Sequence, residues 1–250
     1  MPVGSIRDDG ICVRHWDWSE TSQTVSILTR EHGLLRGLAK GSRRENSAFS
    51  GGIELLTLGQ VQALAKPRST LATITSWDLI EPFRGIRDSL GAYYSGTHVA
   101  DLVGHLVLDD DPHPDLFDAL ASHLHDLSDN PHASPGDRAL GVLRFQWSLL
   151  DAIGSRPELD RDVQSGQALA SAPIFGFSPG LGGFLAQSAS STVWKVRSET
   201  HAVLGRIRSG SDGEFDGESV LRAARLLASY IHHLIGEELS STATLFGHLS

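Results

Sequence analysis

The positively charged side chains near the amino end have the types and spacing of a surface that binds polyanions. Between positions 30 and 44 the chain carries five cations against the single anion Glu31, and the rings of Trp16, Trp18 and Phe49 occur nearby. Single-stranded nucleic acid is held by cations that contact phosphates and by rings that stack on bases. We predict that these cations, with two more on a following hairpin, contact phosphates: Arg30, Arg36, Lys40, Arg43, Arg44, Lys66 and Arg68. A solvated basic face over core aromatics fits the composition equally well.

A serine motif is the most direct indication of an enzyme. Residues 176–180 read Gly-Phe-Ser-Pro-Gly, which matches the nucleophile elbow of hydrolases letter by letter. In that elbow the residue after the serine donates its backbone N–H to the oxyanion hole, and Pro179 has no N–H to donate. No parallel strand-helix-strand pattern surrounds the motif. We therefore expect no catalytic residue, and a hydrolase acting through Ser178 is a distant alternative.

Two further groups could do metal or thiol chemistry. Three aspartates at 109–111, with His113, offer oxygen and imidazole ligands. Because Pro114 is placed to start a helix, the acids are better interpreted as a solvated loop before a helix N-terminus. Cys12 is the one cysteine, lies in an apolar run and cannot form an internal disulfide, so we expect a buried inert thiol and a reducing compartment. We predict neither a metal site nor a cofactor.

A net charge of −9 opposes nucleic-acid binding only if it is spread evenly, because binding depends on the local field at the contact surface. The first eighty residues are slightly positive, and residues 81–250 carry the negative balance. A basic patch on an acidic protein is therefore compatible with the composition. The sequence shows neither a signal peptide nor the roughly 18 consecutive apolar residues of a membrane span. We expect a cytoplasmic, nucleoid-associated protein without membrane contact.

Short strands are predicted through the first eighty residues, where β-branched and aromatic residues cluster between turn signals. Val25 and Ile27 alternate with Thr24 and Ser26, which places the two pairs on opposite faces. The candidate strands are residues 11–18, 24–29, 34–39, 56–65 and 71–79. Five short strands fit a small closed barrel, of which the oligonucleotide-binding (OB) fold is the common five-stranded form. Strand number and length alone allow an SH3-like barrel as well.

After Pro82 the apolar spacing becomes helical. Leucines at three- to four-residue intervals mark two helices, a third begins with Ser134 as N-cap and Pro135 in its first turn, and a last helix covers 221–235. Residues 155–192 lose this periodicity and fill with Gly, Ser and Pro. We predict an α+β, multi-domain protein with a barrel over 1–80 and a helical domain over 81–250, which contains the irregular region 155–192.

Several uncommon short strings occur in an order that resembles one known family. They are WSETS at 18–22, LTREHG at 28–33, RGLAKGSRR at 36–44, LIEPF at 79–83, LRF at 143–145 and LLDAIG at 149–154. In these strings the chain resembles the RecO recombination mediators nearly from end to end. The first four resemble that family's N-terminal barrel and its exit, and the last two resemble its helical body.

The resemblance implies an OB barrel, a helical domain and a non-enzymatic role in homologous recombination repair. It implies binding of single-stranded and double-stranded DNA without sequence specificity, annealing of complementary strands, and help in loading recombinase. The implied partners are RecR and the acidic C-terminal tail of single-stranded-DNA-binding protein. For this tail we predict Arg138 and Arg144, which stand beside apolar positions of one helix. A protein-interaction scaffold whose barrel no longer binds DNA is the alternative.

One departure from the family concerns metal. Many members carry four cysteines in a zinc module, and residues 162–166 and 183–187 of this chain stand where the two pairs would fall. No Cys or His occurs between positions 155 and 192, so ligand chemistry excludes zinc binding there. We expect this region to be held by packing or to be mobile.

Overall fold

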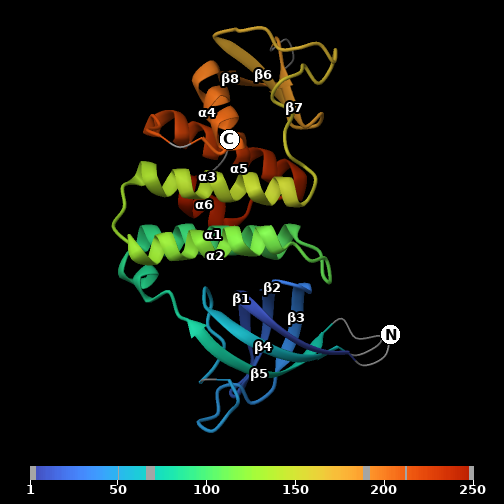
Figure 1. The fold of residues 1–250 in the computed structure, drawn as a ribbon, viewed down its shortest axis with the longest axis vertical. Helices are drawn as coiled ribbons and strands as arrows, with labels where there is room; N and C mark the ends of the chain where they lie inside the picture. The colour runs from blue at the N-terminus through green and yellow to red at the C-terminus, as the bar shows by residue number, and fades with distance from the viewer. Residues whose placement is uncertain (1–3, 50, 66–70, 188–191, 212, 248–250) are drawn as a thin grey trace. The chain divides into compact units, whose positions relative to one another are not determined.

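The computed structural model describes residues 4–49, 51–65, 71–187, 192–211 and 213–247, and Figure 1 shows their helices and strands. Contacts divide the chain into two compact units, Met1–His132 and Ala133–Ser250. The first unit therefore combines the barrel with the two helices that follow it in sequence.

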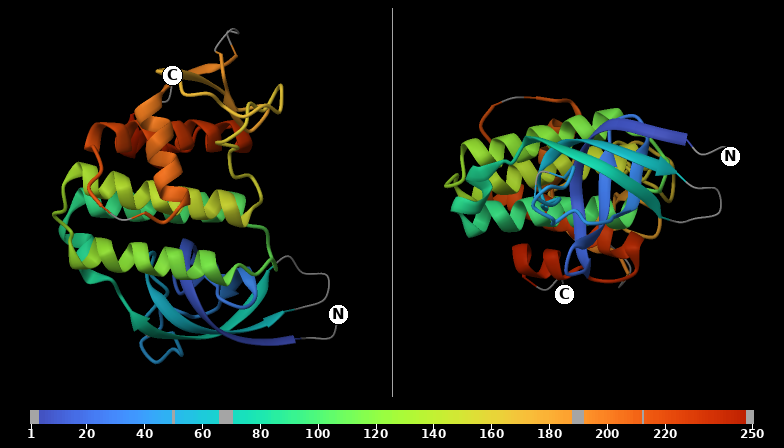
Figure 2. Two further views of the ribbon diagram at one scale, coloured as in Figure 1. Left: turned by 45° about the horizontal axis from the view of Figure 1, so that its top comes forward. Right: turned by 90° about the horizontal axis from the view of Figure 1, so that it is seen from below.

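The amino-terminal strands close into a barrel. They are β1 (Gly4–Ser19), β2 (Ser22–Thr29), β3 (Gly33–Ala39), β4 (Leu58–Ala65) and β5 (Ala72–Glu81). Their order is β1-β2-β3-β5-β4, with β3 parallel to β5 and the other pairs antiparallel. Two further views show the same strands curling around one centre (Figure 2). This is the OB fold predicted from the sequence, not the SH3-like barrel that strand number also allowed.

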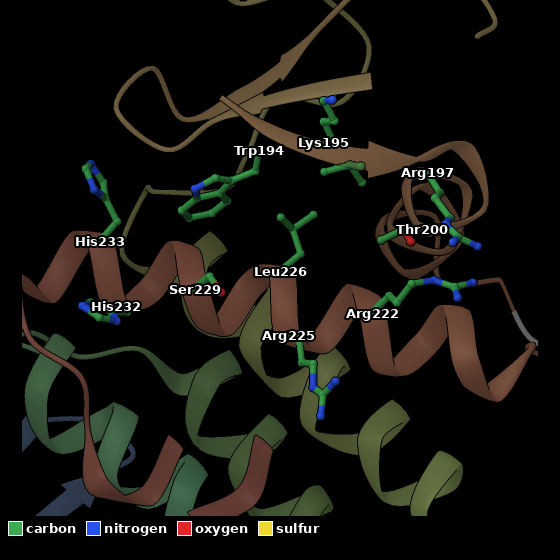
Figure 3. Close-up of a pocket in the computed structure, with 11 residues that line it drawn as sticks. Trp194, Lys195, Arg197, Thr200, Arg222, Arg225, Leu226, Ser229, His232 and His233 are labelled. Carbon is green, nitrogen blue, oxygen red and sulfur yellow. The ribbon is translucent and has the colours of Figure 1, made fainter. Parts of the chain in front are cut away.

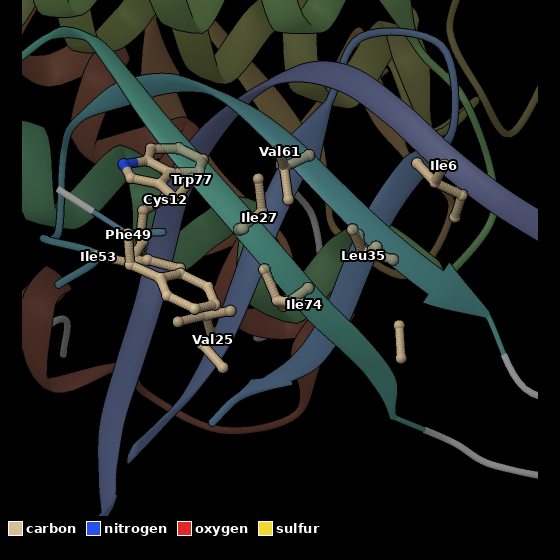
Figure 4. Packing of buried hydrophobic residues seen from close by; sticks show 13 residues of the cluster. Ile6, Cys12, Val25, Ile27, Leu35, Phe49, Ile53, Val61, Ile74 and Trp77 are labelled. Carbon is tan, nitrogen blue, oxygen red and sulfur yellow. The ribbon is translucent and has the colours of Figure 1, made fainter. Parts of the chain in front are cut away.

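Alternation along the strands supplies the barrel core. Val25 and Ile27 share one face, as predicted, and on that face they pack with Trp77 and Phe49 in one buried cluster (Figure 4). A Cβ at Gly59 would lie 2.5 Å from the Trp77 ring, so glycine is needed where β4 passes this side chain. Phe49 is only 5% exposed. Its ring belongs to the core and is not available to bases.

Two helices complete the first unit. After the short 3-10 helix η1 (Arg84–Asp88), α1 (Leu90–Leu106) and α2 (Pro114–Asp129) lie side by side, and α1 also contacts β1. The leucines of α2 are buried at the predicted helical spacing, and so are Val99, Leu102 and Val103 of α1. Leu90, which was predicted to share that face, is exposed at the start of α1. Pro114 occupies the first turn of α2, as predicted from its place after the three aspartates.

Within its described residues, the second unit combines helices with a small antiparallel sheet. The helices are α3 (Pro135–Ala152), α4 (Ser198–Arg208), α5 (Gly217–Ile235) and α6 (Ser240–Phe246). The strands are β6 (Ile174–Ser178), β7 (Gly183–Leu185) and β8 (Trp194–Arg197), in the order β7-β6-β8. Ser134 caps α3 as predicted, because its Oγ accepts the Asp137 N–H at 3.2 Å. No helix among the described residues has both the length and the apolar character needed to cross a bilayer.

Candidate nucleic-acid interface

Three of the predicted cations gather on one loop at one end of the barrel. Lys40, Arg43 and Arg44 lie in the loop that follows β3, and all three side chains are exposed. The loop packs against the β1–β2 turn, where the Arg43 N–H donates to Thr21 O at 3.2 Å. This contact brings the loop cations beside the end of β1.

Two exposed tryptophans stand at the same end. Trp16 and Trp18 are 52% and 66% exposed and flank Asp17 on β1. The Asp17 carboxylate forms an ion pair with Arg43 at 2.5 Å. Because this pair joins the loop to the strand that carries both rings, cations and aromatic rings occur together at this end of the barrel.

A buried glutamine holds the loop in place. The Gln23 Oε1 accepts the Ile53 N–H at 3.0 Å and the Ser42 hydroxyl at 2.9 Å, and its Nε2 donates to Ile53 O at 3.1 Å. These bonds fix both ends of the loop to β2 and satisfy a polar group that is costly to bury alone. The sequence analysis missed Gln23, whose signal was a polar residue in register with the inward-facing Val25 and Ile27.

Arg30 and Arg36 lie away from this loop. Arg30 sits in the β2–β3 turn, and the seven residues of β3 separate that turn from Lys40 by roughly 23 Å of strand. Arg30 Nη2 is 2.7 Å from Asp118 Oδ2 on α2, and Arg36 Nε is 2.7 Å from Asp109 Oδ1. The structure therefore brings the loop cations together, separates Arg30 from them along β3, and pairs both Arg30 and Arg36 with aspartates.

The two groups also differ in how their charge is balanced. Arg30 and Arg36 each have a carboxylate partner, and Arg14 of β1 likewise pairs with Asp101 of α1 at 2.6 Å. Over the part of the chain that the structure describes, Lys40 and Arg44 form no ion pair. Their charge is therefore not balanced by an adjacent carboxylate. The remaining two predicted cations, Lys66 and Arg68, lie outside the described residues.

The two arginines predicted for a partner peptide have different surroundings. Arg138 donates to Ala133 O just before α3 begins. Arg144 is exposed and lines a pocket of about 290 Å³ together with Trp147 of the same helix and Arg206 of α4. The structure thus groups Arg144 with Arg206, which the sequence analysis missed because no periodic signal marked α4.

A single carboxylate, that of Asp162, joins the two segments 162–166 and 183–187, which the resemblance matched to a zinc module. Asp162 Oδ1 accepts the N–H groups of Gln164 and Ser165 at 2.9 and 2.8 Å, and Oδ2 accepts the Ala186 N–H at 2.8 Å. These bonds, that of Ala186 foremost, hold the pKa of Asp162 below its ordinary value. Both oxygens are engaged with backbone donors, so the residues present do not fit a zinc ion. We call this arrangement the Asp162 clasp.

Aromatic packing supports the same region. The Phe177 and Phe184 rings, from β6 and β7, meet edge to face at 5.1 Å between centroids, and Tyr230 of α5 meets Phe177 in the same way at 5.4 Å. The sequence analysis expected this region either to be held by packing or to be mobile. The described residues agree with the first expectation.

The other chemical candidates occupy structural positions. Ser178 ends an antiparallel strand, and its Oγ accepts the Leu181 N–H at 3.3 Å. This is a strand-turn-strand geometry and not the strand-to-helix turn of a nucleophile elbow. Asp111 Oδ2 lies 3.1 Å from His113 Nε2, and the described residues contain no cluster of three or more side chains arranged to hold a metal. Burial raises the pKa of the Cys12 thiol to about 12, as expected of a core residue.

Comparisons with known proteins cover both parts of the chain. The family described as Recombination protein O N terminal matches residues 1–83, and Recombination protein O C terminal matches residues 87–243. DNA repair protein RecO from Anaeromyxobacter sp. (strain Fw109-5) is 31% identical over 242 residues, which is 93% of this chain and 92% of that protein. DNA repair protein RecO from Bacillus pumilus is 30% identical over 186 residues, or 74% of this chain and 69% of the relative. Because the two family models together span nearly all of the sequence, the chain belongs to the RecO family of DNA repair proteins.

Proposed function

We propose that this chain binds single-stranded and double-stranded DNA without sequence specificity, anneals complementary strands and helps to load recombinase in homologous recombination. The observation that carries the proposal is the group of exposed rings and cations at one end of the OB barrel. That group consists of Trp16, Trp18, Lys40, Arg43 and Arg44. Rings for bases and cations for phosphates are the two requirements of binding to unpaired strands.

The proposed chemistry is electrostatic. Phosphates are the same for every base, so cations that contact them position a strand without reading its sequence. Two strands whose charge is neutralised on one surface repel each other less, which allows complementary bases to meet. No covalent bond forms or breaks in this process, and we therefore propose a protein that is not an enzyme and needs no cofactor.

We expect the predicted cations to contribute unequally. Lys40 and Arg44 can contact a phosphate without giving up a carboxylate, whereas Arg30 and Arg36 each have an aspartate at 2.7 Å. Exposed ion pairs are worth at most about 1 kcal/mol, so a polyanion can still compete for these two arginines. Their contribution should be smaller than that of the loop.

A salt titration of oligonucleotide binding tests the proposal. The double variant Lys40→Glu with Arg44→Glu should weaken binding to a short single strand by about tenfold or more. It should also flatten the log–log salt dependence by about 1.4, because each phosphate contact contributes about 0.7. The matched control reverses two exposed arginines that are not part of the loop, Arg7→Glu with Arg161→Glu, and should change the slope much less. An unchanged slope in the loop variant would remove Lys40 and Arg44 from the interface.

The proposed partners are RecR and the acidic C-terminal tail of single-stranded-DNA-binding protein. Family membership supports RecR, and co-elution of the two purified proteins tests it.

For the tail, the pocket of Arg144, Arg206 and Trp147 offers guanidinium groups beside an apolar ring, which suits an acidic peptide that ends in an apolar residue. In fluorescence anisotropy with a labelled tail peptide, Arg144→Glu should weaken binding more than Arg138→Glu, since Arg144 lines this pocket and Arg138 does not. Undiminished binding after Arg144→Glu would reject the pocket.

The second candidate function is a protein-interaction scaffold whose barrel no longer binds DNA. The ion pairs that balance Arg30, Arg36 and Arg43 favour it, because they reduce the positive field available to a polyanion. The two candidates differ in one simple measurement. A purified protein that ignores unpaired DNA even in dilute buffer would be a scaffold.

A further inference from the structure

A groove beside the small sheet of the second unit is left unused by the proposed function. It has a volume of about 510 Å³ and lies between β8 and α5 (Figure 3). All four residues of β8, Trp194–Arg197, line it. Since four consecutive residues line it, the groove follows the length of this strand.

That edge is open over the described residues. In the order β7-β6-β8 the last strand pairs with β6 on one side, and no described segment pairs with it on the other. Unpaired N–H and C=O groups along a strand edge form a template on which a further extended chain can pair. The groove therefore offers main-chain hydrogen bonds to a ligand that has a peptide backbone.

The exposed face of β8 is cationic. Lys195 and Arg197 are two residues apart, so they lie on the same face, and both are exposed. Neither forms an ion pair within the described part of the chain. No acidic side chain is among the described residues that line the groove. Outside it, Glu199 accepts a hydrogen bond from Ser198, and Glu218 is paired with Arg222.

The opposite face of β8 is apolar. Val196 is buried, and Trp194 is stacked on Phe177 at 5.6 Å with the rings 13° from parallel, which fixes the indole. Leu226 of α5 points into the same space as Trp194 (Figure 3). A strand added to this edge would therefore meet cations on one face and apolar groups on the other.

We propose that this groove binds an extended acidic peptide segment of a partner protein, which adds to β8 as a fourth strand of the sheet. Its carboxylates alternate with apolar side chains, so that the carboxylates pair across the strands with Lys195 and Arg197 while the apolar side chains contact Trp194 and Leu226. A nucleic acid would find the cations but could not use the strand edge. The inference goes beyond the DNA-binding proposal and concerns different residues.

Fluorescence anisotropy of the full chain with a synthetic peptide tests the proposal. The probe is a labelled peptide of about eight residues in which Val and Asp alternate, long enough to span the four residues of β8. It should bind, and replacing every Asp by Asn should weaken binding by about tenfold or more. A peptide of the same composition with the Asp residues in one block should also bind at least about tenfold more weakly, because it cannot place charge on one face only. Methylation of alternate peptide nitrogens should have a similar effect, since it removes the main-chain donors.

Variants of the protein locate the site. Lys195→Glu with Arg197→Glu should weaken the alternating peptide by about tenfold or more, and these exposed positions allow the change without loss of the fold. Lys40→Glu with Arg44→Glu is the matched control, which should impair DNA binding and leave the peptide unaffected, so the two proposals fail independently. Equal binding of the block and alternating peptides would overturn the strand-addition proposal. So would displacement of the peptide by a short single-stranded oligonucleotide, which would make the groove a nucleic-acid site, or the absence of binding to the alternating peptide.

Discussion

At the scale of the residue, Asp162 shows how one side chain can join two segments that are distant in the sequence. Its two oxygens bond the turn at Gln164 and Ser165 and the backbone at Ala186. Hydrogen bonds to a carboxylate are about twice as strong as those between neutral groups. Because the backbone donors would otherwise lose their partners, the clasp should matter more for stability than an ordinary surface aspartate.

We expect Asp162→Ala to lower the free energy of unfolding by about 2–4 kcal/mol, the cost of leaving several donors without a charged acceptor. The stability of Asp162→Asn should lie between those of the unchanged protein and Asp162→Ala, because asparagine keeps one acceptor oxygen. Urea denaturation followed by fluorescence measures both. The control is Asp160→Asn, which removes a neighbouring carboxylate that pairs with Arg208 on the surface and should cost less than about 1 kcal/mol. Equal losses at both positions would show that the clasp carries no special share of the stability.

At the scale of the element, apolar periodicity predicted the long elements and missed the short ones. The five barrel strands and helices α1, α2, α3 and α5 occur where they were predicted, because each repeats its pattern often enough to be recognised. The exception in extent is β1, which begins at Gly4 and not at Ile11 as predicted. Strands β6, β7 and β8 have five, three and four residues, too few for alternation to be visible. Their sheet is built by rings from separate segments, such as Phe177 and Tyr230, and sequence alone does not show which rings meet.

The candidate interface was predictable in residue type but not in arrangement. The cluster of cations was visible in the sequence. Arg30 and Asp118, however, are 88 positions apart, so the sequence does not show the ion pair that balances Arg30. Lys40 and Arg44 come after β3, whereas Arg30 comes before it. Only the barrel topology shows that the loop after β3 lies at the same end of the barrel as Trp16 and Trp18, and that Arg30 does not. Local composition therefore gave the chemistry, and long-range contacts decided which charges are balanced.

Helices α1 and α2 each bury a histidine, which makes the first unit sensitive to acid. Burial lowers the pKa of His98 and of His123 from 6.5 to about 4, and His98 adds to the effect at His123. The unfolded chain therefore takes up protons first as the pH falls below 6.5. The free energy of unfolding should be undiminished above pH 7 and should drop between pH 6.5 and pH 4, by about 2 kcal/mol per histidine at pH 5.

Urea denaturation at pH 7 and pH 5 measures this effect. His123→Leu removes one titrating group from the buried pair, so the difference in stability between the two pH values should shrink. His132→Leu, an exposed histidine outside the helices, is the control and should leave the difference unchanged. A pH dependence that is the same in all three proteins would exclude the buried pair as its source.

At the scale of the whole molecule, a net charge of −9 is combined with a proposed affinity for a polyanion. Part of the explanation lies in the first unit, where Arg14, Arg30 and Arg36 of the barrel segment pair with aspartates of the helical segment. These carboxylates reduce the positive field of the barrel, whereas Lys40 and Arg44 of the loop after β3 form no ion pair among the described residues. The distribution of ion pairs, more than the total charge, should therefore set the affinity for DNA.

Removing the balancing carboxylates should raise that affinity. We expect Asp109→Asn with Asp118→Asn to tighten binding to single-stranded DNA about threefold to tenfold at low salt, because Arg36 and Arg30 become available to phosphates. Asp115→Asn with Asp126→Asn changes the net charge by the same amount at exposed positions without an ion pair among the described residues. Oligonucleotide titrations of both variants separate the two effects. An equal gain in both would mean that only total charge matters.

The Asp162 clasp also determines which stresses this module withstands. A cluster of thiolates around zinc can be emptied by chelators and attacked by peroxide, whereas a carboxylate bonded to amides offers neither a bound metal to extract nor sulfur to oxidise. The sheet beside it should therefore keep its shape in a cell that is starved of zinc or under oxidative attack. A repair protein whose sheet is joined by a carboxylate should therefore stay folded during oxidative attack, when DNA damage is frequent.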